Sequence, residues 1–169
     1  MAALGVSASL GWLARPAAAL EARGELTLYN THTAERLDVI YRSAAGQYDR
    51  DALGALDYLL RCHATGKVAE MDLRTIEFLN LVDKRLGGGL DIHVISGYRS
   101  PEYNARLAHR DRGVASSSLH VLGRAIDIRI PAVDLRELRR TALGLEYGGV
   151  GYYPRSGFVH LDSGRVRSW

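Results

Sequence analysis

The segment Ala125–Ile130, with the sequence AIDIRI, constrains the fold of this chain more than any other. Its strict alternation predicts a β-strand with Ala125, Asp127 and Arg129 on one face and three isoleucines on the other. A carboxylate placed among isoleucines requires compensation, because an unpaired buried charge is very costly. A metal ion would provide it. The segment therefore predicts a strand that brings Asp127 to a bound cation.

The rest of the chain reads as a mixture of helices and short strands. Alternating apolar residues from Glu25 to Ala44, interrupted by a polar stretch, predict a β-hairpin. Further elements are a helix from about residue 51, a helix over 72–86 that ends at three glycines, a strand over 91–96, a helix from Ser100-Pro101, a loop over 110–118, a helix over 134–143 and glycine-linked short strands to the end. No internal repeat or low-complexity linker is present. We expect one α+β domain over residues 23–169, with a central, mainly antiparallel sheet flanked by helices.

Composition excludes several classes of protein. The 169 residues are 47% hydrophobic and 24% charged, as in ordinary globular proteins. The net charge is +3 and the basic residues form no concentrated run, so the sequence does not predict a nucleic-acid partner. The single cysteine, Cys62, rules out an internal disulfide and a metal site built from several thiolates. Cys62 falls in a stretch whose amphipathic pattern predicts a helix, and a buried, inert thiol is the expected role.

The first 22 residues are small and apolar and resemble the end of an export signal. Ala17-Ala18-Ala19 and Ala22 are small residues suited to cleavage, although the basic segment that normally precedes them is missing. Either the start site is assigned wrongly or the likeness is accidental, and export to the periplasm or cell envelope is the expectation. No later stretch of about 20 apolar residues occurs, so we expect no membrane span in the domain.

Two segments carry the side chains with chemistry. His120 precedes the strand that contains Asp127, and Gly123 between them permits a tight reversal. Farther along, His160 and Asp162 alternate in a predicted strand and point the same way. Two imidazoles and one carboxylate are a common catalytic zinc set, in which the fourth position is left for water. Taken singly, each histidine is more often a surface or core residue, and we assign that ordinary role to the other four, which are His32, His63, His93 and His109.

These residues also resemble a known family. The pattern Ser-x-His-x-x-Gly-x-Ala-x-Asp, from Ser118 to Asp127, is similar to the signature of zinc D-Ala-D-Ala carboxypeptidases and dipeptidases. Those enzymes are the LAS peptidoglycan peptidases, which have the Hedgehog/D,D-peptidase fold. Ser96–Ser100 (SGYRS) and His160 match as well, and the most similar branch is the YcbK-like group of exported envelope proteins. That branch resembles the chain also in THTAE (31–35), GGVGYY (148–153) and RSW (167–169).

The resemblance implies a site built around one Zn²⁺ ion. Its expected ligands are His120, Asp127 and His160. Arg99 would contact substrate or stabilise a developing oxyanion, as a fixed guanidinium does, with a structural salt bridge as the alternative. Ser118 would lie beside the metal and hydrogen-bond either the substrate or the loop backbone, and Tyr98 is the other residue expected to contact substrate.

The implied function is zinc-dependent hydrolysis of amide bonds in peptidoglycan stem peptides or cross-bridges. Relatives place a Glu three residues before the last histidine ligand or a His two residues before it, but here those positions are Gly157 and Phe158. Neither can act as a general base. Asp162 is the candidate substitute, or else it orients a ligand histidine. A peptidoglycan-binding envelope protein that retains the metal site without catalysis is therefore the alternative.

Overall fold

The computed structural model describes residues 22–110 and 118–169. Most of the possible export segment and most of the expected loop over 110–118 lie outside the described residues. In the described part, no helix is both long enough and apolar enough to cross a membrane.

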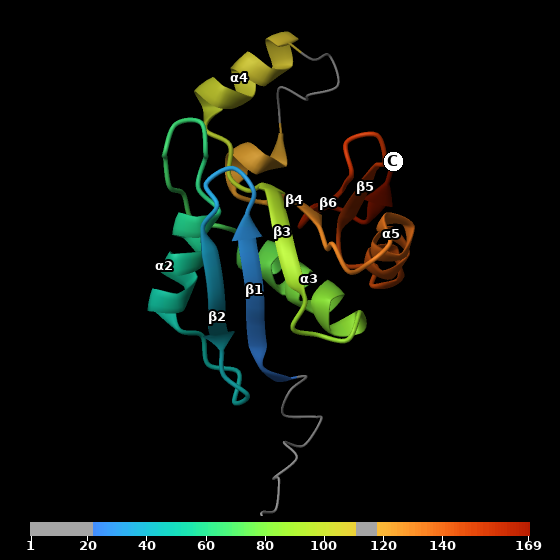
Figure 1. Cartoon of the computed structure of the whole chain (residues 1–169). Helices are drawn as coiled ribbons and strands as arrows, with labels where there is room; N and C mark the ends of the chain where they lie inside the picture. Colours follow the sequence, from blue (N-terminus) through green and yellow to red (C-terminus); the bar gives the residue numbers. More distant parts are fainter. Residues whose placement is uncertain (1–21, 111–117) are drawn as a thin grey trace, which may run out of the picture.

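The protein is built on one seven-stranded sheet (Figure 1). Its strands are β1 (Gly24–Asn30), β2 (Arg36–Arg42), β3 (Asp91–Ser96), β4 (Ala125–Arg129), β5 (Gly149–Tyr153), β6 (Phe158–Asp162) and β7 (Arg167–Ser168). They lie in the order β2-β1-β3-β4-β6-β5-β7. Only the β1–β3 and β5–β7 pairs are parallel, and the other neighbours are antiparallel. The predicted α+β class with a mainly antiparallel sheet is confirmed.

Helices begin at the polar residues that the sequence offers as caps. They are α2 (Arg50–Leu59), α3 (Leu73–Arg85), α4 (Pro101–Arg110), α5 (Leu135–Gly144) and a 3₁₀ turn, η1 (Leu119–Leu122). The Asp72 and Asp134 side chains accept hydrogen bonds from backbone N–H groups two residues later. The Ser100 hydroxyl accepts one from the N–H of Tyr103 at 3.3 Å. Each cap satisfies a donor that the first helical turn leaves without a partner.

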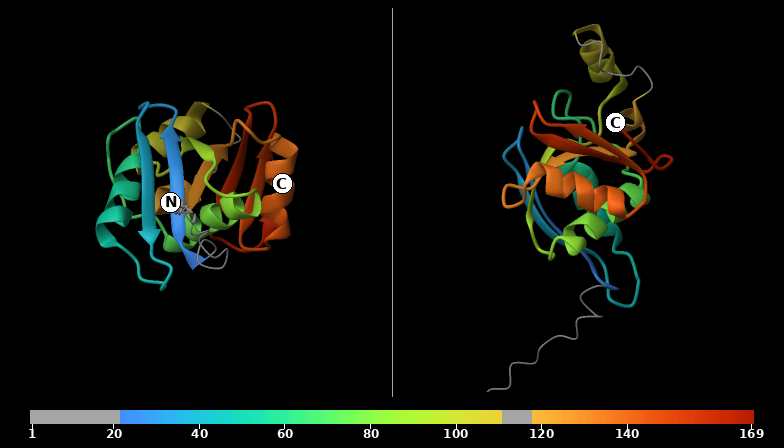
Figure 2. Two further views of the ribbon diagram at one scale, coloured as in Figure 1. Left: turned by 60° about the horizontal axis from the view of Figure 1, so that its bottom comes forward. Right: turned by 90° about the vertical axis from the view of Figure 1, so that its right-hand side faces the viewer.

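One face of the sheet is packed and the other carries polar side chains. Ile126 and Ile128 on β4 are fully buried in the hydrophobic core together with Phe78 and Leu79 of α3. Helix α3 contacts β1, β6 and α5, and α5 contacts β5 and β6. Because side chains alternate along a strand, Asp127 lies on the opposite face from the two isoleucines. Helix α4 stands out from the body of the fold near the ends of β1 and β3 (Figures 1 and 2).

The prediction that Cys62 lies in a helix is wrong. Helix α2 ends at Leu59, and Cys62 lies in the loop that follows, where it is fully buried. Just after the helix ends, the Leu60 carbonyl accepts a hydrogen bond from the N–H of Tyr98 at 2.8 Å. This close approach requires Gly97, since a Cβ there would lie 2.4 Å from the Leu60 oxygen. The expectation of a buried thiol is confirmed.

Candidate metal centre

The register of the sheet places four residues in one row across its polar face. Ser96 on β3 pairs with Asp127 on β4, which pairs with His160 on β6, which pairs with Gly151 on β5. Side chains of directly paired residues lie on the same face of a sheet. Strand pairing alone therefore brings the Asp127 carboxylate against the His160 imidazole.

His120 reaches the same place from η1. Ser118 caps this turn, its side chain accepting a hydrogen bond from the His120 N–H at 3.4 Å. Gly123 ends the turn with φ at 66°, a conformation that favours glycine, and a Cβ there would lie 2.4 Å from the Glu70 carbonyl. The carbonyl of His120 also accepts a hydrogen bond from the N–H of Arg99 at 3.1 Å. The predicted reversal at Gly123 is confirmed, and it aims the imidazole at β4.

The three side chains converge through one atom each. His160 Nδ1 lies 2.8 Å from Asp127 Oδ1, and His120 Nε2 lies 3.3 Å from each of those two atoms. All three residues are buried. Ligands at 2.0–2.1 Å from a tetrahedral Zn²⁺ stand about 3.3 Å from one another. The triangle therefore has the dimensions of a metal site.

The outward ring nitrogens fix which atoms face the centre. His120 Nδ1 lies 2.8 Å from the Gly97 carbonyl, which only accepts, so Nδ1 carries the proton and Nε2 presents its lone pair inward. His160 Nε2 lies 3.1 Å from an oxygen of Asp162, so Nδ1 faces inward in the same way. Two imidazole lone pairs and one carboxylate oxygen thus point at one another. A cation between them satisfies all three, so these residues fit a bound metal ion.

The electrostatics agree with this assignment. Burial alone would raise the pKa of Asp127, but His120 and His160 outweigh burial and hold that pKa well below its usual range. Burial lowers the pKa of His120. Burial also opposes a charge on His160, but hydrogen bonds to Asp127 and Asp162 overcome it and raise the His160 pKa. In addition to the Arg99 guanidinium at the other oxygen of Asp127, the cluster thus favours a positive charge among its three converging atoms, which either a proton on His160 or a metal ion provides.

Asp162 is engaged through both of its oxygens. Oδ2 meets His160 Nε2 at 3.1 Å and Arg167 Nη2 at 2.7 Å, and Oδ1 accepts from Arg167 Nη1 at 2.9 Å and from the Gly164 N–H at 2.8 Å. Its side chain is fully buried. Burial would raise the pKa of Asp162, but His160 and Arg167 hold it well below its usual range. This environment favours a carboxylate that orients His160 over one that accepts a proton from water.

Arg99 lies beside the ligand carboxylate. Its Nη2 donates to Asp127 Oδ2 at 2.6 Å and its Nε donates to the Ser96 hydroxyl at 2.8 Å. Asp127 therefore directs one oxygen to the histidines and the other to the guanidinium. Of the two expected substrate contacts, Ser118 caps η1, and Tyr98 packs, partly buried, against the hydrophobic core.

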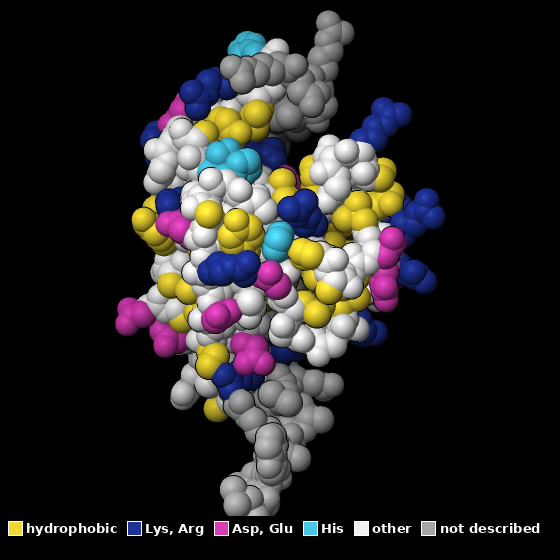
Figure 3. Space-filling model, in the orientation of Figure 1, with side chains coloured by type: hydrophobic (Ala, Val, Ile, Leu, Met, Phe, Trp, Pro, Cys, Tyr) yellow, Lys and Arg dark blue, Asp and Glu magenta, His cyan; other side chains and the backbone are white. Residues whose placement is uncertain are grey.

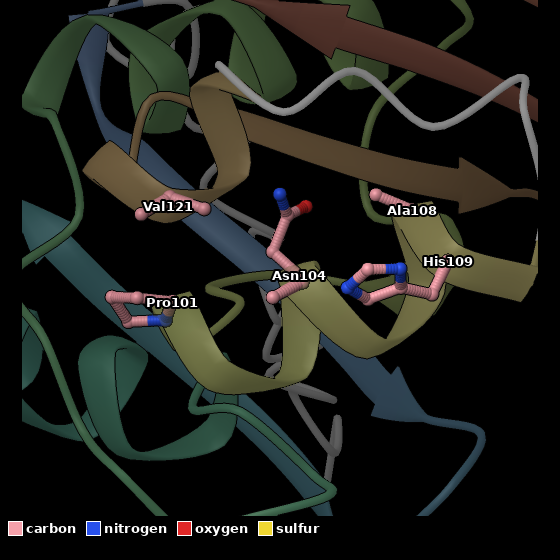
Figure 4. A pocket seen from close by; sticks show the side chains of 6 residues that line it. Pro101, Asn104, Ala108, His109 and Val121 are labelled. Atoms are coloured by element: carbon pink, nitrogen blue, oxygen red, sulfur yellow. The ribbon is translucent and has the colours of Figure 1, made fainter.

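A hollow and a pocket lie near this centre. The surface is hollowed between the part that carries α4 and the part built from β5 and β6 (Figure 3). A separate pocket of about 370 Å³ lies between α4 and η1. Its lining includes Asn104 and His109 from α4 and Val121 from η1 (Figure 4). None of its lining residues belongs to the converging triangle, but Val121 directly follows His120 in η1.

The sequence does not predict the part of the site that β5 and β7 build, which is the ion pair of Asp162 and Arg167 beside Gly149. A Cβ at Gly149 would lie 2.3 Å from both Asp162 Oδ2 and Arg167 Nη1, so glycine makes room for this ion pair. Two glycines on one face of a predicted strand, Gly149 and Gly151, are the signal, because glycine inside a strand often marks a close approach. Nothing local connects that signal to Arg167.

Two buried imidazoles and a buried carboxylate, each histidine held by its outer nitrogen, could hold a metal ion, and mononuclear metallopeptidases use donor sets of this type. Comparison with known proteins identifies the family. Residues 17–169 match the peptidase M15 family model described as "Peptidoglycan L,D-endopeptidase MepK". The chain belongs to this metal-dependent peptidase family, and the family predicted from the Ser118–Asp127 pattern is confirmed.

Individual relatives are similar over most of their length. The "Probable peptidoglycan L,D-endopeptidase MepK" of Haemophilus influenzae is 42% identical over 145 residues, covering 85% of this chain and 77% of the relative. The "Peptidoglycan L,D-endopeptidase MepK" of Escherichia coli K12 is 39% identical over 144 residues, covering 85% of this chain and 79% of the relative. Membership of this family makes the chain an enzyme, a peptidase.

Proposed function

We propose that this chain is a zinc-dependent endopeptidase that hydrolyses amide bonds in the peptide cross-links of peptidoglycan, in the cell envelope. The observation that carries the proposal is the buried convergence of His120 Nε2, Asp127 Oδ1 and His160 Nδ1 within 4.8 Å of one another. The relatives' names supply the substrate class and the preference for a bond between an L- and a D-configured centre. The small-residue segment before residue 22 supports export.

The residues around the centre have separable roles. His120, Asp127 and His160 hold the ion, and a bound Zn²⁺ supplies Lewis-acid activation of water and of the scissile carbonyl. Arg99 holds the second oxygen of Asp127 and places a fixed positive charge beside the reacting carbonyl, which would stabilise an oxyanion. Ser118 positions η1 and so the ring of His120.

We assign Asp162 as a positioning residue. A carboxylate that accepts a proton needs an available lone pair and a pKa near the working pH. Both oxygens of Asp162 are engaged, and its pKa is lowered by His160 and Arg167, after burial has acted in the opposite direction. Gly157 and Phe158 occupy the positions where relatives of other branches keep their acid–base residue. Asp162 therefore acts through His160, whose outer nitrogen it holds.

Digestion of muropeptides tests the proposal. The purified, zinc-loaded chain is incubated with cross-linked muropeptides, and the products are identified by mass spectrometry. We expect cleavage between an L- and a D-centre, its loss with chelator and its return with Zn²⁺. His120→Ala should fall to background because one of three ligands is gone. His109→Ala, an exposed histidine outside the triangle, is the matched control and should keep full activity. Equal product from His120→Ala and the wild type would overturn the proposal.

A further inference from the structure

We propose that the indole of Trp169 forms one wall of the metal centre and positions the substrate by packing against the peptide next to the scissile amide. This inference rests on the proposed function and names a specificity-determining residue for it. The register of β5, β6 and β7 brings Trp169 beside the candidate metal ligand His160.

Gly151 is the fourth member of the row that contains Asp127 and His160. Its missing side chain leaves space on the polar face of the sheet, and the Trp169 ring fills that space. A Cβ at Gly151 would lie 2.8 Å from two ring atoms of Trp169. As a result, the ring centroids of Trp169 and His160 are 5.3 Å apart, with their planes at 53°. The indole therefore stands directly beside a ligand of the proposed metal.

The position of Trp169 is fixed by several independent contacts. Its N–H donates to the Val150 carbonyl at 3.3 Å, and its carbonyl accepts from the Tyr152 N–H at 3.0 Å. The indole Nε1 donates to the Tyr153 hydroxyl at 2.8 Å, and the Arg167 guanidinium lies 4.7 Å from the ring centroid. The ring is thus held in place on the scaffold before any substrate arrives, which is what a positioning surface requires.

Despite these contacts, Trp169 remains 47% exposed. A large, rigid aromatic surface beside a catalytic centre is typical of a substrate-contacting wall, since aromatic rings offer much contact area at little entropic cost. The Trp169 ring lies next to His160, so it meets the part of the substrate nearest the scissile bond. In a peptidoglycan cross-link that part is peptide, and the glycan strands lie farther away.

A purely structural role is the competing explanation. Arg167 contacts both the Trp169 ring and Asp162, and Asp162 holds His160. On this explanation, loss of the ring only loosens a metal ligand. The two explanations predict changes in different measurable quantities. A substrate wall changes KM with little change in zinc content, whereas a structural support changes zinc content and kcat.

The test combines kinetics with fluorescence. The printed sequence has two tryptophans, so Trp12→Phe leaves Trp169 as the only indole among these 169 residues. In that background we compare Trp169, Trp169→Phe and Trp169→Ala, all loaded with zinc. The probe is sugar-free cross-linked stem peptide, with the disaccharide-bearing form as a second probe. Val166→Ala, which removes an exposed apolar side chain near the same end of the chain, is the matched control.

We expect Trp169→Ala to raise KM about tenfold, with kcat and zinc content nearly unchanged, and Trp169→Phe to recover most of the loss. Sugar-free peptide should shift the Trp169 emission, and Val166→Ala should behave as wild type. An unchanged KM, a loss of zinc with unchanged KM, or an emission shift with the disaccharide-bearing probe alone would each overturn the inference. If the wild type cleaves no muropeptide, the proposed function fails, while the fluorescence titration still decides whether peptide meets Trp169.

Discussion

At the scale of one residue, the neighbours of Asp162 favour a carboxylate that orients His160. It has no exposed surface, and it joins a candidate metal ligand to Arg167. Such outer partners set the orientation and basicity of a ligand histidine. Asp162→Asn keeps the shape but removes the charge, so we expect zinc affinity to fall about 10–100-fold. At saturating zinc most of kcat should return.

The measurement is zinc competition with a chromophoric chelator, followed by kcat at saturating zinc. Asp38→Asn, an exposed carboxylate on β2, is the control and should leave both quantities unchanged. If kcat stays abolished when zinc is saturating and bound, Asp162 takes part in proton transfer and the positioning role is wrong.

At the scale of an element, the glycines of β5 leave space on the sheet for side chains from other strands. Gly149 opposes Asp162, and the Asp162–Arg167 ion pair occupies the space where a Cβ would be. Gly149→Ala should therefore destabilise the fold by about 1–3 kcal/mol through overpacking. It should also lower zinc affinity, because the displaced carboxylate no longer holds His160.

Gly54→Ala is the matched control for this element. Gly54 lies inside α2, and a Cβ there would have no neighbour within 4 Å. Alanine has the higher helix propensity, so we expect a gain of about 0.5–1 kcal/mol and unchanged zinc affinity. Urea unfolding of both variants measures the difference. Equal effects at the two glycines would show that the space beside Asp162 is not required.

At the scale of the whole molecule, a bound metal would join η1, β4 and β6, which are distant in sequence. A ligand that binds only the folded chain stabilises it by about 2.7 kcal/mol at 100 times its Kd. Zinc should therefore raise Tm, and the increment should grow as pH rises. The sign follows from His160, whose pKa is raised by Asp127 and Asp162 against the effect of burial. Its proton persists to higher pH in the metal-free chain and must leave before zinc binds.

Calorimetry with and without zinc at pH 5.5 and 8 measures this linkage. We expect a clearly larger zinc-dependent Tm shift at pH 8 than at pH 5.5. His120→Ala should show little shift at either pH. A shift of equal size in His120→Ala would mean that zinc binds elsewhere.

Local signals predicted the elements well. The alternation of Ala125–Ile130 predicted β4 and its two faces, and Asp72, Ser100 and Asp134 predicted helix starts that the structure confirms. The prediction of a helix at Cys62 failed: α2 ends at Leu59, and the Leu60 carbonyl pairs with the N–H of the distant Tyr98, a contact that no local pattern reveals. The 3₁₀ turn η1 was also missed, since four residues show no usable periodicity.

Residue types and local alternation were enough to predict the candidate donor set, the packed and polar faces of β4 and the family, because each of these shows within a short stretch of the chain. By contrast, the pairing of Gly149 and Gly151 with Asp162 and His160, and the placement of Arg167 and Trp169 in the space beside them, became visible in the folded chain alone. The physical reason is strand pairing. Register between β5, β6 and β7 joins residues by backbone hydrogen bonds that no side-chain pattern within one strand specifies.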